Sequence, residues 1–217
     1  MAGGALDVLG QVPGVAGRPV AVPHDDRAMA FTRLHLVRHG EQDPASDHAP
    51  EGGLSPRGRE QAERLGRRLS NTPFAAIHHS PLARAAQTAD LVAAHLGPVP
   101  RHACDHVTDR TPVPSPARRG DYPERWLSWL DDVPRDERDE DAKALRTAVE
   151  HFGATDDQDR NELLITHNFV IGWFVRHVLD APEWRWIGLN LDNCALTVVE
   201  WDSSRPPRLI TFNESVS

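Results

Sequence analysis

Residues 34–41 have the sequence LHLVRHGE, in which a short apolar run ends at two basic side chains. This run predicts a buried strand over residues 34–37 that ends in a loop carrying Arg38 and His39. Residues 163–166, LLIT, predict a second buried strand that ends at His167. Further strands are expected over residues 74–79, 99–107, 195–201 and 208–212.

Helix signals alternate with these strands. Ser55 and Pro56 supply an N-cap and a first-turn proline ahead of apolar residues at helical spacing. Ser80 and Pro81 offer the same start to a second helix, and residues 169–179 form a mostly apolar third one. The alternation predicts an α/β fold, a three-layer sandwich whose mostly parallel central sheet is flanked by helices.

The composition narrows the class of protein. The chain has 217 residues, 39% apolar and 26% charged, which fits a globular domain with a sizeable core. Its net charge of −8 argues against wholesale nucleic-acid binding, and no apolar run approaches the roughly 18 residues of a membrane span. Two cysteines, Cys104 and Cys194, do not make a disulfide framework, so we expect a reducing compartment, the cytoplasm.

Two segments depart from the alternating pattern. Residues 1–30 show no helical or strand period, so we expect a flexible N-terminal extension before a single domain over residues 31–217. Residues 109–140 are rich in proline and charge, which predicts an insertion in that domain. Trp126 and Trp129, three residues apart, would pack one face of a short helix, which favours a lid over a disordered loop.

The basic side chains follow three different expected strands. Arg38 and His39 end the first, Arg84 lies one turn into the helix after the second, and His167 ends the fourth. The carboxyl ends of parallel strands meet at one edge of a sheet, so these side chains are expected to converge. Guanidinium groups match pairs of phosphate oxygens. The sequence therefore predicts a positively charged phosphate pocket in an acidic protein.

Several segments resemble the histidine phosphatase superfamily, also called phosphoglycerate-mutase-like. They follow one another in the order of that family and extend over roughly residues 32–200. The matching segments are residues 36–41 (LVRHGE), 54–58 (LSPRG) with 61–62 (QA), 80–89 (SPLARAAQTA), and His167 in place of the second family histidine.

The resemblance implies phosphoryl transfer through a phosphohistidine. His39 would be the nucleophile, since a neutral imidazole attacks phosphorus without losing a proton first. Arg38, Arg84 and His167 would hold the phosphoryl oxygens and neutralise their charge in the transition state. These groups take the place of the usual magnesium ion, so neither a metal nor another cofactor is expected.

The family places its general acid shortly after the third strand, where Asp109 stands in this chain. A carboxylic acid there would protonate the leaving alkoxide. Asp105 is the alternative acid, and Asp109 would otherwise only cap the turn that follows it. Ser80, which ends the second strand, and Asn168 are expected to contribute to substrate binding, although Asn168 would alternatively cap the helix after His167.

The substrate stays open at this point. Gln42, Asp43 and Pro44 follow the first motif where true mutases have a different pattern, which argues against mutase activity. Residues 167–171 and 191–197 are similar to the phosphoprotein-phosphatase branch. We therefore expect a phosphomonoester hydrolase, a monomer or homodimer, that acts on a phosphorylated small molecule or a phosphoprotein. The alternatives are mutase-type transfer and a weakly active protein that binds phosphorylated ligands.

Overall fold

The computed structural model describes residues 30–46, 51–155 and 157–215. The N-terminal extension expected over residues 1–30 therefore lies outside the described residues, apart from Ala30. Within them, six strands form one sheet in the order β3-β2-β6-β1-β7-β8. The sheet consists of β1 (Phe31–Arg38), β2 (Ala76–His79), β3 (Arg101–Ala103), β6 (Arg160–Thr166), β7 (Leu196–Asp202) and β8 (Arg205–Glu214).

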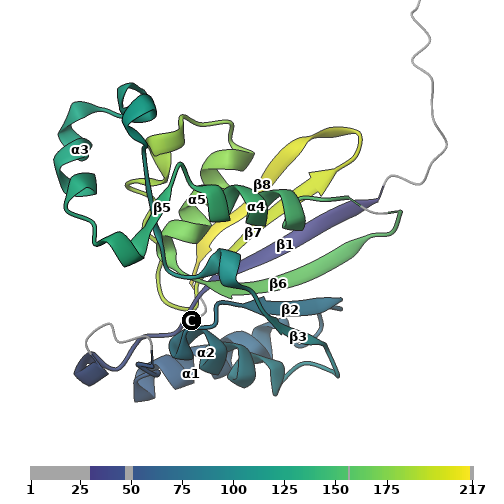
Figure 1. Ribbon diagram of the computed structural model, residues 1–217. Helices are drawn as coiled ribbons and strands as arrows, with labels where there is room; N and C mark the ends of the chain where they lie inside the picture. Colours follow the sequence, from purple (N-terminus) through teal and green to yellow (C-terminus); the bar gives the residue numbers. More distant parts are fainter. Residues whose placement is uncertain (1–29, 47–50, 156, 216–217) are drawn as a thin grey trace, which may run out of the picture.

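Neighbouring strands from β3 to β1 run parallel, whereas β7 and β8 pair antiparallel at one edge. Helices cover both faces of the sheet, with α1 and α2 below it and α4 and α5 above it in Figure 1. The expected α/β fold with a mostly parallel sheet is confirmed. The helices are α1 (Pro56–Leu69), α2 (Ala83–Ala93), α3 (Glu124–Asp131), α4 (Lys143–Phe152) and α5 (Asn168–Val178).

The two faces of the sheet bury separate apolar clusters. Leu34 and Leu36 of β1 pack on the side of α4 and α5, whereas Val37 packs on the side of α1 and α2. Leu164 and Ile165 of β6 divide between the two faces in the same way. A strand that is buried on both faces has a nearly continuous run of apolar residues in its sequence. For this reason β1 and β6 could be predicted from the sequence.

The starts of α1 and α2 differ, although both follow a Ser-Pro pair. Ser55 caps α1, because its hydroxyl accepts a hydrogen bond from the Gly58 amide at 3.0 Å. The expected cap at Ser80 is wrong, since α2 begins at Ala83 and its N-cap residue, Leu82, makes no side-chain hydrogen bond. The Ser80 hydroxyl instead faces a histidine at the end of β6.

Three further segments differ from the sequence-based expectations. The strand expected over residues 99–107 is divided into the short β3 and a 3-10 helix, η2 (Asp105–Val107). Helix α4 and the 3-10 helix η5 (Glu183–Trp186) are absent from the elements expected above. The other 3-10 helices are η1 (Pro44–Ser46), η3 (Pro116–Asp121) and η4 (Arg135–Glu137).

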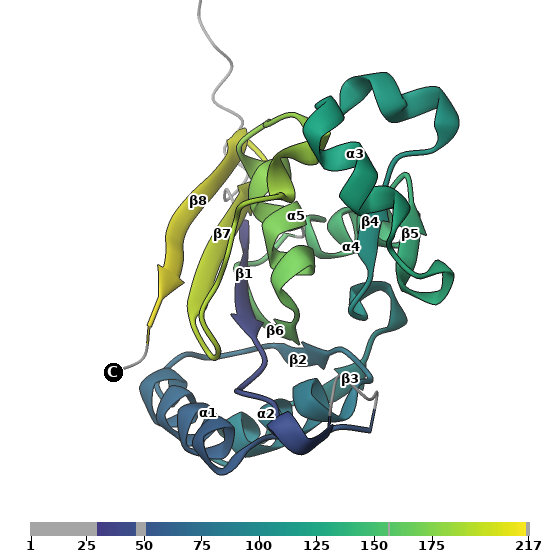
Figure 2. The same ribbon diagram turned by 90° about the vertical axis from the view of Figure 1, so that its left-hand side faces the viewer.

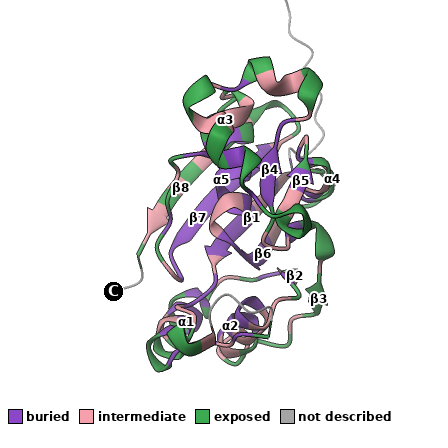
Figure 3. Cartoon of the chain, turned by 60° about the vertical axis from the view of Figure 1, so that its left-hand side comes forward, coloured by how far each residue is buried: buried purple, intermediate pink, exposed green. Residues whose placement is uncertain are grey.

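The segment expected to be an insertion leaves and re-enters the domain through a parallel pair of strands, β4 (Thr111–Val113) and β5 (Arg138–Glu140). Between them lies α3, which Figure 2 shows next to β4 and β5. Leu130 of α3 is buried, and Trp126 packs against the core from the same helix. Figure 3 shows buried strands at the centre and exposed residues on α3. A lid role for this segment stays a prediction.

Two glycines let the loop after β1 lie directly against α1. A Cβ atom added at Gly58 would come within 2.1 Å of the Glu41 carbonyl oxygen, and one added at Gly40 within 2.5 Å of the Gly58 carbonyl oxygen. Both contacts are with backbone atoms, which cannot rotate away as a flexible side chain can. This close approach fixes the loop that carries His39.

We expect Gly58→Ala to lower the free energy of unfolding by about 1–3 kcal/mol, because the added methyl group forces α1 and the loop apart. This loss is opposite in sign to the usual result of replacing glycine by alanine in a helix, which raises the free energy of unfolding by up to about 1 kcal/mol. Urea unfolding measures the change. Gly97→Ala is the matched control, since nothing lies within 4 Å of its Cβ position. Equal stabilities of the two variants would contradict the proposed close packing.

Candidate active site

The register of the sheet brings three loops to one place. Arg38 of β1 pairs with Thr166 of β6, and His79 of β2 pairs with Ile165. The ladder continues past the strand ends, since the His39 amide donates to the Thr166 carbonyl at 2.9 Å and the Ser80 amide to the Ile165 carbonyl at 3.0 Å. His39, Ser80 and the residue after Thr166 therefore lie side by side at the carboxyl edge of the sheet.

His39 is held as a neutral ring of defined orientation. Its Nδ1 lies 2.7 Å from the Gly40 carbonyl oxygen, which can only accept, so Nδ1 carries the proton and Nε2 has the free lone pair. Burial, followed by the positive charges of His167, Arg84 and Arg38, lowers the pKa of His39 to about 3. The ring is therefore neutral near pH 7, with an unprotonated nitrogen available as a nucleophile.

His167 lies next to His39, with the two ring centroids 5.1 Å apart. It is the N-cap residue of α5 and is only 1% exposed. Its Nε2 is 2.8 Å from the Ser80 hydroxyl oxygen. Burial, with the charges of Arg84 and Arg38, holds the pKa of His167 well below its usual value. Ser80 thus contacts a histidine of the site, and through it lies within the predicted pocket.

Arg84 lies in the first turn of α2 and is 4% exposed. A cation near a helix N-terminus is electrostatically unfavourable, so the position needs a compensating anion. Asp109 supplies it, because its Oδ2 accepts from Arg84 Nη2 at 2.7 Å. The same oxygen lies 3.4 Å from His167 Nδ1. The structure therefore brings Asp109 into the site, whereas the exposed Asp105 lies in η2.

Arg38 and Asn168 share a partner segment, residues 189–191. Arg38 Nη1 donates to the Leu191 carbonyl oxygen. The Asn168 side chain donates to the Leu189 carbonyl at 3.2 Å and accepts from the Leu191 amide at 2.7 Å. Asn168, predicted as a substrate-binding residue, thus holds the segment that in turn holds Arg38.

Three buried nitrogen atoms of the site have no hydrogen-bond partner within the part of the chain that the structure describes. They are Arg38 Nε, Arg84 Nη1 and His167 Nδ1. A buried donor without a partner raises the free energy of the folded state by about 1–3 kcal/mol. The two guanidinium groups are donors, and together with the histidine nitrogen they lie near the unprotonated nitrogen of His39. This arrangement is complementary to an anion with several acceptor oxygens. The arrangement is suited to binding a phosphoryl group beside a nucleophile.

Residues that support the loops were not singled out from the sequence as site residues. Thr88 accepts from the Gly40 amide at 3.0 Å, and Asn193 donates to the His39 carbonyl at 2.9 Å. Glu41 accepts from the Ser55 hydroxyl at 2.8 Å, and Gln61 accepts from the Glu41 amide at 2.9 Å. All of them lie in segments that resemble the family, Asn193 in residues 191–197, so their place in those segments is the signal that could have identified them.

Two features are absent from the residues that the structure describes. These residues contain no group of three or more His, Cys, Asp or Glu side chains arranged to hold a metal ion. None of their helices is both long and apolar enough to span a membrane.

Two curated relatives are similar to most of this chain. "Serine/threonine-protein phosphatase PGAM5, mitochondrial" of Rattus norvegicus is 31% identical over 174 residues, which are 79% of this chain and 58% of the relative. The protein of the same description from Caenorhabditis elegans is 31% identical over 185 residues, 84% of this chain and 61% of the relative. The chain thus spans about three fifths of the length of these relatives.

Solved structures show the same fold. A putative alpha-ribazole-5'-P phosphatase from Escherichia coli superposes with a TM-score of 0.64 at 21% identity, covering 84% of this chain and 96% of that chain. A phosphoglycerate mutase from Plasmodium falciparum superposes with a TM-score of 0.56 at 20% identity, covering 84% of this chain and 91% of that chain. The expected phosphoglycerate-mutase-like fold is confirmed.

The resemblance that the sequence motifs indicated is confirmed over nearly the whole described chain. The model of the histidine phosphatase superfamily (branch 1) matches residues 34–215. This range includes all the loops that meet at the carboxyl edge of the sheet. The chain belongs to branch 1 of the histidine phosphatase superfamily.

Proposed function

We propose that the protein is a phosphomonoester hydrolase that works through a phosphohistidine on His39. The observation that carries the proposal is the free Nε2 of a neutral, buried His39 next to two arginine donors and a histidine nitrogen without hydrogen-bond partners. Membership of a phosphatase superfamily supports it. The names of the relatives, serine/threonine-protein phosphatases, favour a phosphoprotein substrate, and a small phosphate ester is the other source of the same phosphomonoester group.

In the first step the lone pair on His39 Nε2 attacks phosphorus, and the bond from phosphorus to the ester oxygen breaks. The leaving oxygen takes a proton from Asp109 and departs as an alcohol. Asp109 is the candidate for this role because its carboxyl group lies among the side chains of the site, 2.7 Å from Arg84 and 3.4 Å from His167 Nδ1, and is 38% exposed at the edge of the site. His39 holds the phosphoryl group as an N–P bond.

In the second step a water molecule attacks the phosphohistidine. Asp109, now a carboxylate, accepts the proton of that water, and the N–P bond breaks with its electron pair returning to Nε2. Inorganic phosphate leaves, and His39 is neutral again. Each step therefore moves one proton through the same carboxyl group.

Arg38, Arg84 and His167 stabilise the charge on the phosphoryl oxygens in both steps. The two guanidinium groups supply positive charge where other phosphoryl-transfer enzymes use a metal ion, so we infer a metal-independent reaction. An incoming phosphate dianion favours a protonated neighbour, so its arrival would raise the pKa of His167 and strengthen a hydrogen bond from His167 to the phosphate.

We also propose a cytoplasmic setting for the protein. Both cysteines are free thiols, and Cys194 is buried.

Replacement of the nucleophile tests the mechanism. We expect His39→Ala to lower kcat at least about a thousandfold on p-nitrophenyl phosphate with EDTA present. Rapid acid-free quenching of the wild type with labelled substrate should trap acid-labile, base-stable phosphate on His39. His106→Ala, which removes an exposed histidine of η2, is the matched control and should keep both the label and the turnover. Near-normal activity of His39→Ala would refute the mechanism.

The role of Asp109 is tested by changing the leaving group. Asp109→Asn should slow an alkyl phosphate at least about tenfold more than p-nitrophenyl phosphate, because nitrophenolate leaves without a proton and an alkoxide does not. The difference should lie in kcat/KM, which covers only the step that releases the alcohol, because the second step uses Asp109 with both substrates; steady-state kinetics measures it, and the two substrates are compared on this ratio. Asp105→Asn is the control and should slow neither substrate. An equal slowing of both substrates by Asp109→Asn would indicate a structural role.

The lowered pKa of His39 has a consequence for stability. The unfolded histidine takes up a proton near pH 6.5, whereas the folded one does so only near pH 3. Between these values the unfolded state binds more protons, so the free energy of unfolding falls as the pH is lowered, by up to about 1.4 kcal/mol per pH unit from this residue. We expect His39→Gln to reduce the slope between about pH 6 and pH 4.5 by that amount, measured by urea unfolding.

Asn168→Ala is the control for this measurement, because it removes two hydrogen bonds of the same site without removing a titratable group. It should lower the stability at every pH and leave the slope unchanged. If wild type and His39→Gln had the same slope, the pKa of His39 would not be lowered in the folded protein.

A further inference from the structure

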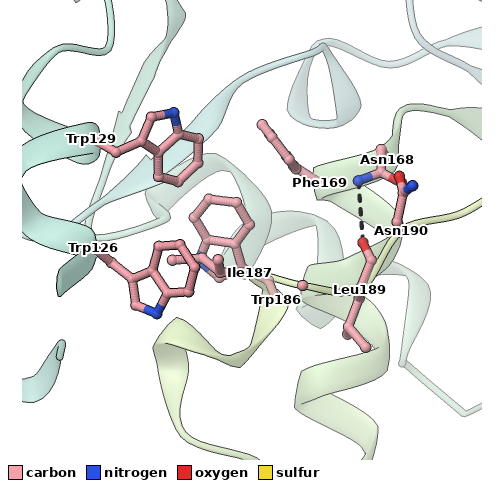
Figure 4. Close-up of a pocket in the computed structure, with 9 residues that line it drawn as sticks. Trp126, Trp129, Asn168, Phe169, Trp186, Ile187, Leu189 and Asn190 are labelled. Carbon is pink, nitrogen blue, oxygen red and sulfur yellow. Dashed lines mark hydrogen bonds between the residues drawn. The ribbon is translucent and has the colours of Figure 1, made fainter.

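An apolar cavity of about 340 Å³ lies next to the proposed phosphoryl site. Its walls include the rings of Trp126 and Trp129 of α3, Phe169 of α5 and Trp186 of η5, as Figure 4 shows. We call these four rings and the space between them the aromatic pocket. Its size is at the lower end of the range for small-molecule sites, which suits one ring-sized group.

The rings of the pocket are held by one another. Phe169 and Trp186 meet edge to face with their centroids 4.9 Å apart, and Trp129 lies 5.9 Å from Trp186 and 6.1 Å from Phe169. Trp186 is fully buried, whereas Trp129 is 41% exposed. The pocket thus has a fixed floor and one aromatic wall that is open to solvent.

One chain segment connects this pocket with the phosphoryl site. Asn168, which follows the site histidine His167, lines the aromatic pocket together with Leu189. Its side chain bonds to Leu189 and Leu191, and the Leu191 carbonyl accepts from Arg38. A phosphate held by Arg38 and His167 therefore has the aromatic pocket as its neighbour.

The lining of the pocket is free of charge. Among the described residues that line it, the polar side chains besides the indole N–H groups are the amides of Asn168 and Asn190, and none is ionisable. A second phosphate or a carboxylate on the substrate would need a cation there. An anionic group is therefore disfavoured in the pocket, and rings arranged edge to face favour an aromatic group there.

We propose that the aromatic pocket binds an aromatic ring carried by the alcohol part of the substrate. This assignment rests on the proposed function and specifies its substrate class, phosphomonoesters whose leaving group bears a neutral aromatic ring. The ring belongs either to a small ester or to an aromatic side chain next to a phosphorylated serine in a peptide. The recognition chemistry is the same for both sources.

The first experiment compares 2-phenylethyl phosphate with ethyl phosphate. Both release a primary alkoxide, so the demand on the acid is matched and only the ring differs. We expect kcat/KM at least about tenfold higher for the phenylethyl ester, from burial of the ring. Trp129→Ala and Phe169→Ala should bring the ratio toward one. Ile210→Ala, which removes an exposed side chain of β8, should keep it.

A second arm uses phosphoserine peptides with phenylalanine or alanine beside the phosphoserine. A preference for the aromatic member in either arm supports the proposal and identifies the source of the ring. Equal kcat/KM values within both pairs would overturn it.

A binding measurement separates the pocket from the chemistry. Titration with 2-phenylethylphosphonate and with ethylphosphonate, followed by tryptophan fluorescence, should give at least about tenfold tighter binding of the aromatic compound. If no ester were hydrolysed, the proposed function would be refuted, and this titration would still decide the role of the pocket. Equal affinities for the two phosphonates, with no preference for the aromatic peptide either, would refute the pocket assignment.

Discussion

The site depends on the parallel pairing of β1 with β6. The pairing of Arg38 with Thr166 and the hydrogen bond from the His39 amide to the Thr166 carbonyl place two histidines from distant parts of the chain in contact. A shift of the register by one residue would turn the side chains of one strand to the opposite face. Both faces of these strands are apolar and close-packed, so such a shift would misfit the side chains of both clusters, and the packing of the core thereby fixes the distance between the two rings.

Around the two histidines, charged and polar side chains are buried in positions that are unfavourable for them. Arg84 is a buried cation in the first turn of a helix, and two histidine rings are buried beside it and Arg38. Each feature alone raises the free energy of the folded state. The large cores on either face of the sheet and the hydrogen bonds of Asp109 and Gly40 offset this. Conflicts of this kind between local preference and tertiary position are expected where a protein carries its function.

The difference between local patterns and long-range contacts explains which features the sequence could predict. The apolar runs of β1 and β6 and the Ser55 cap of α1 depend on neighbouring residues, so local patterns identified them. Ser80 has the same local signal, but α2 begins only at Ala83, and the Ser80 hydroxyl contacts His167 as well as the Leu82 amide, a long-range contact that the local signal does not contain. The contacts of Thr88 and Asn193 with the loop of His39 link remote segments, so spacing could not predict them. The arginine–histidine cluster was predictable because parallel strands end at one edge.

Asn168 shows how the two parts of the proposed substrate site are coupled. Its amide holds residues 189–191 from both sides, at the Leu189 carbonyl and at the Leu191 amide. One end of that segment lines the aromatic pocket and the other binds Arg38. The positions of a bound ring and of the phosphoryl group are therefore set by a single short segment. Binding energy gained in the pocket can then orient phosphorus toward His39, which makes it available to the transition state as well as to the bound substrate.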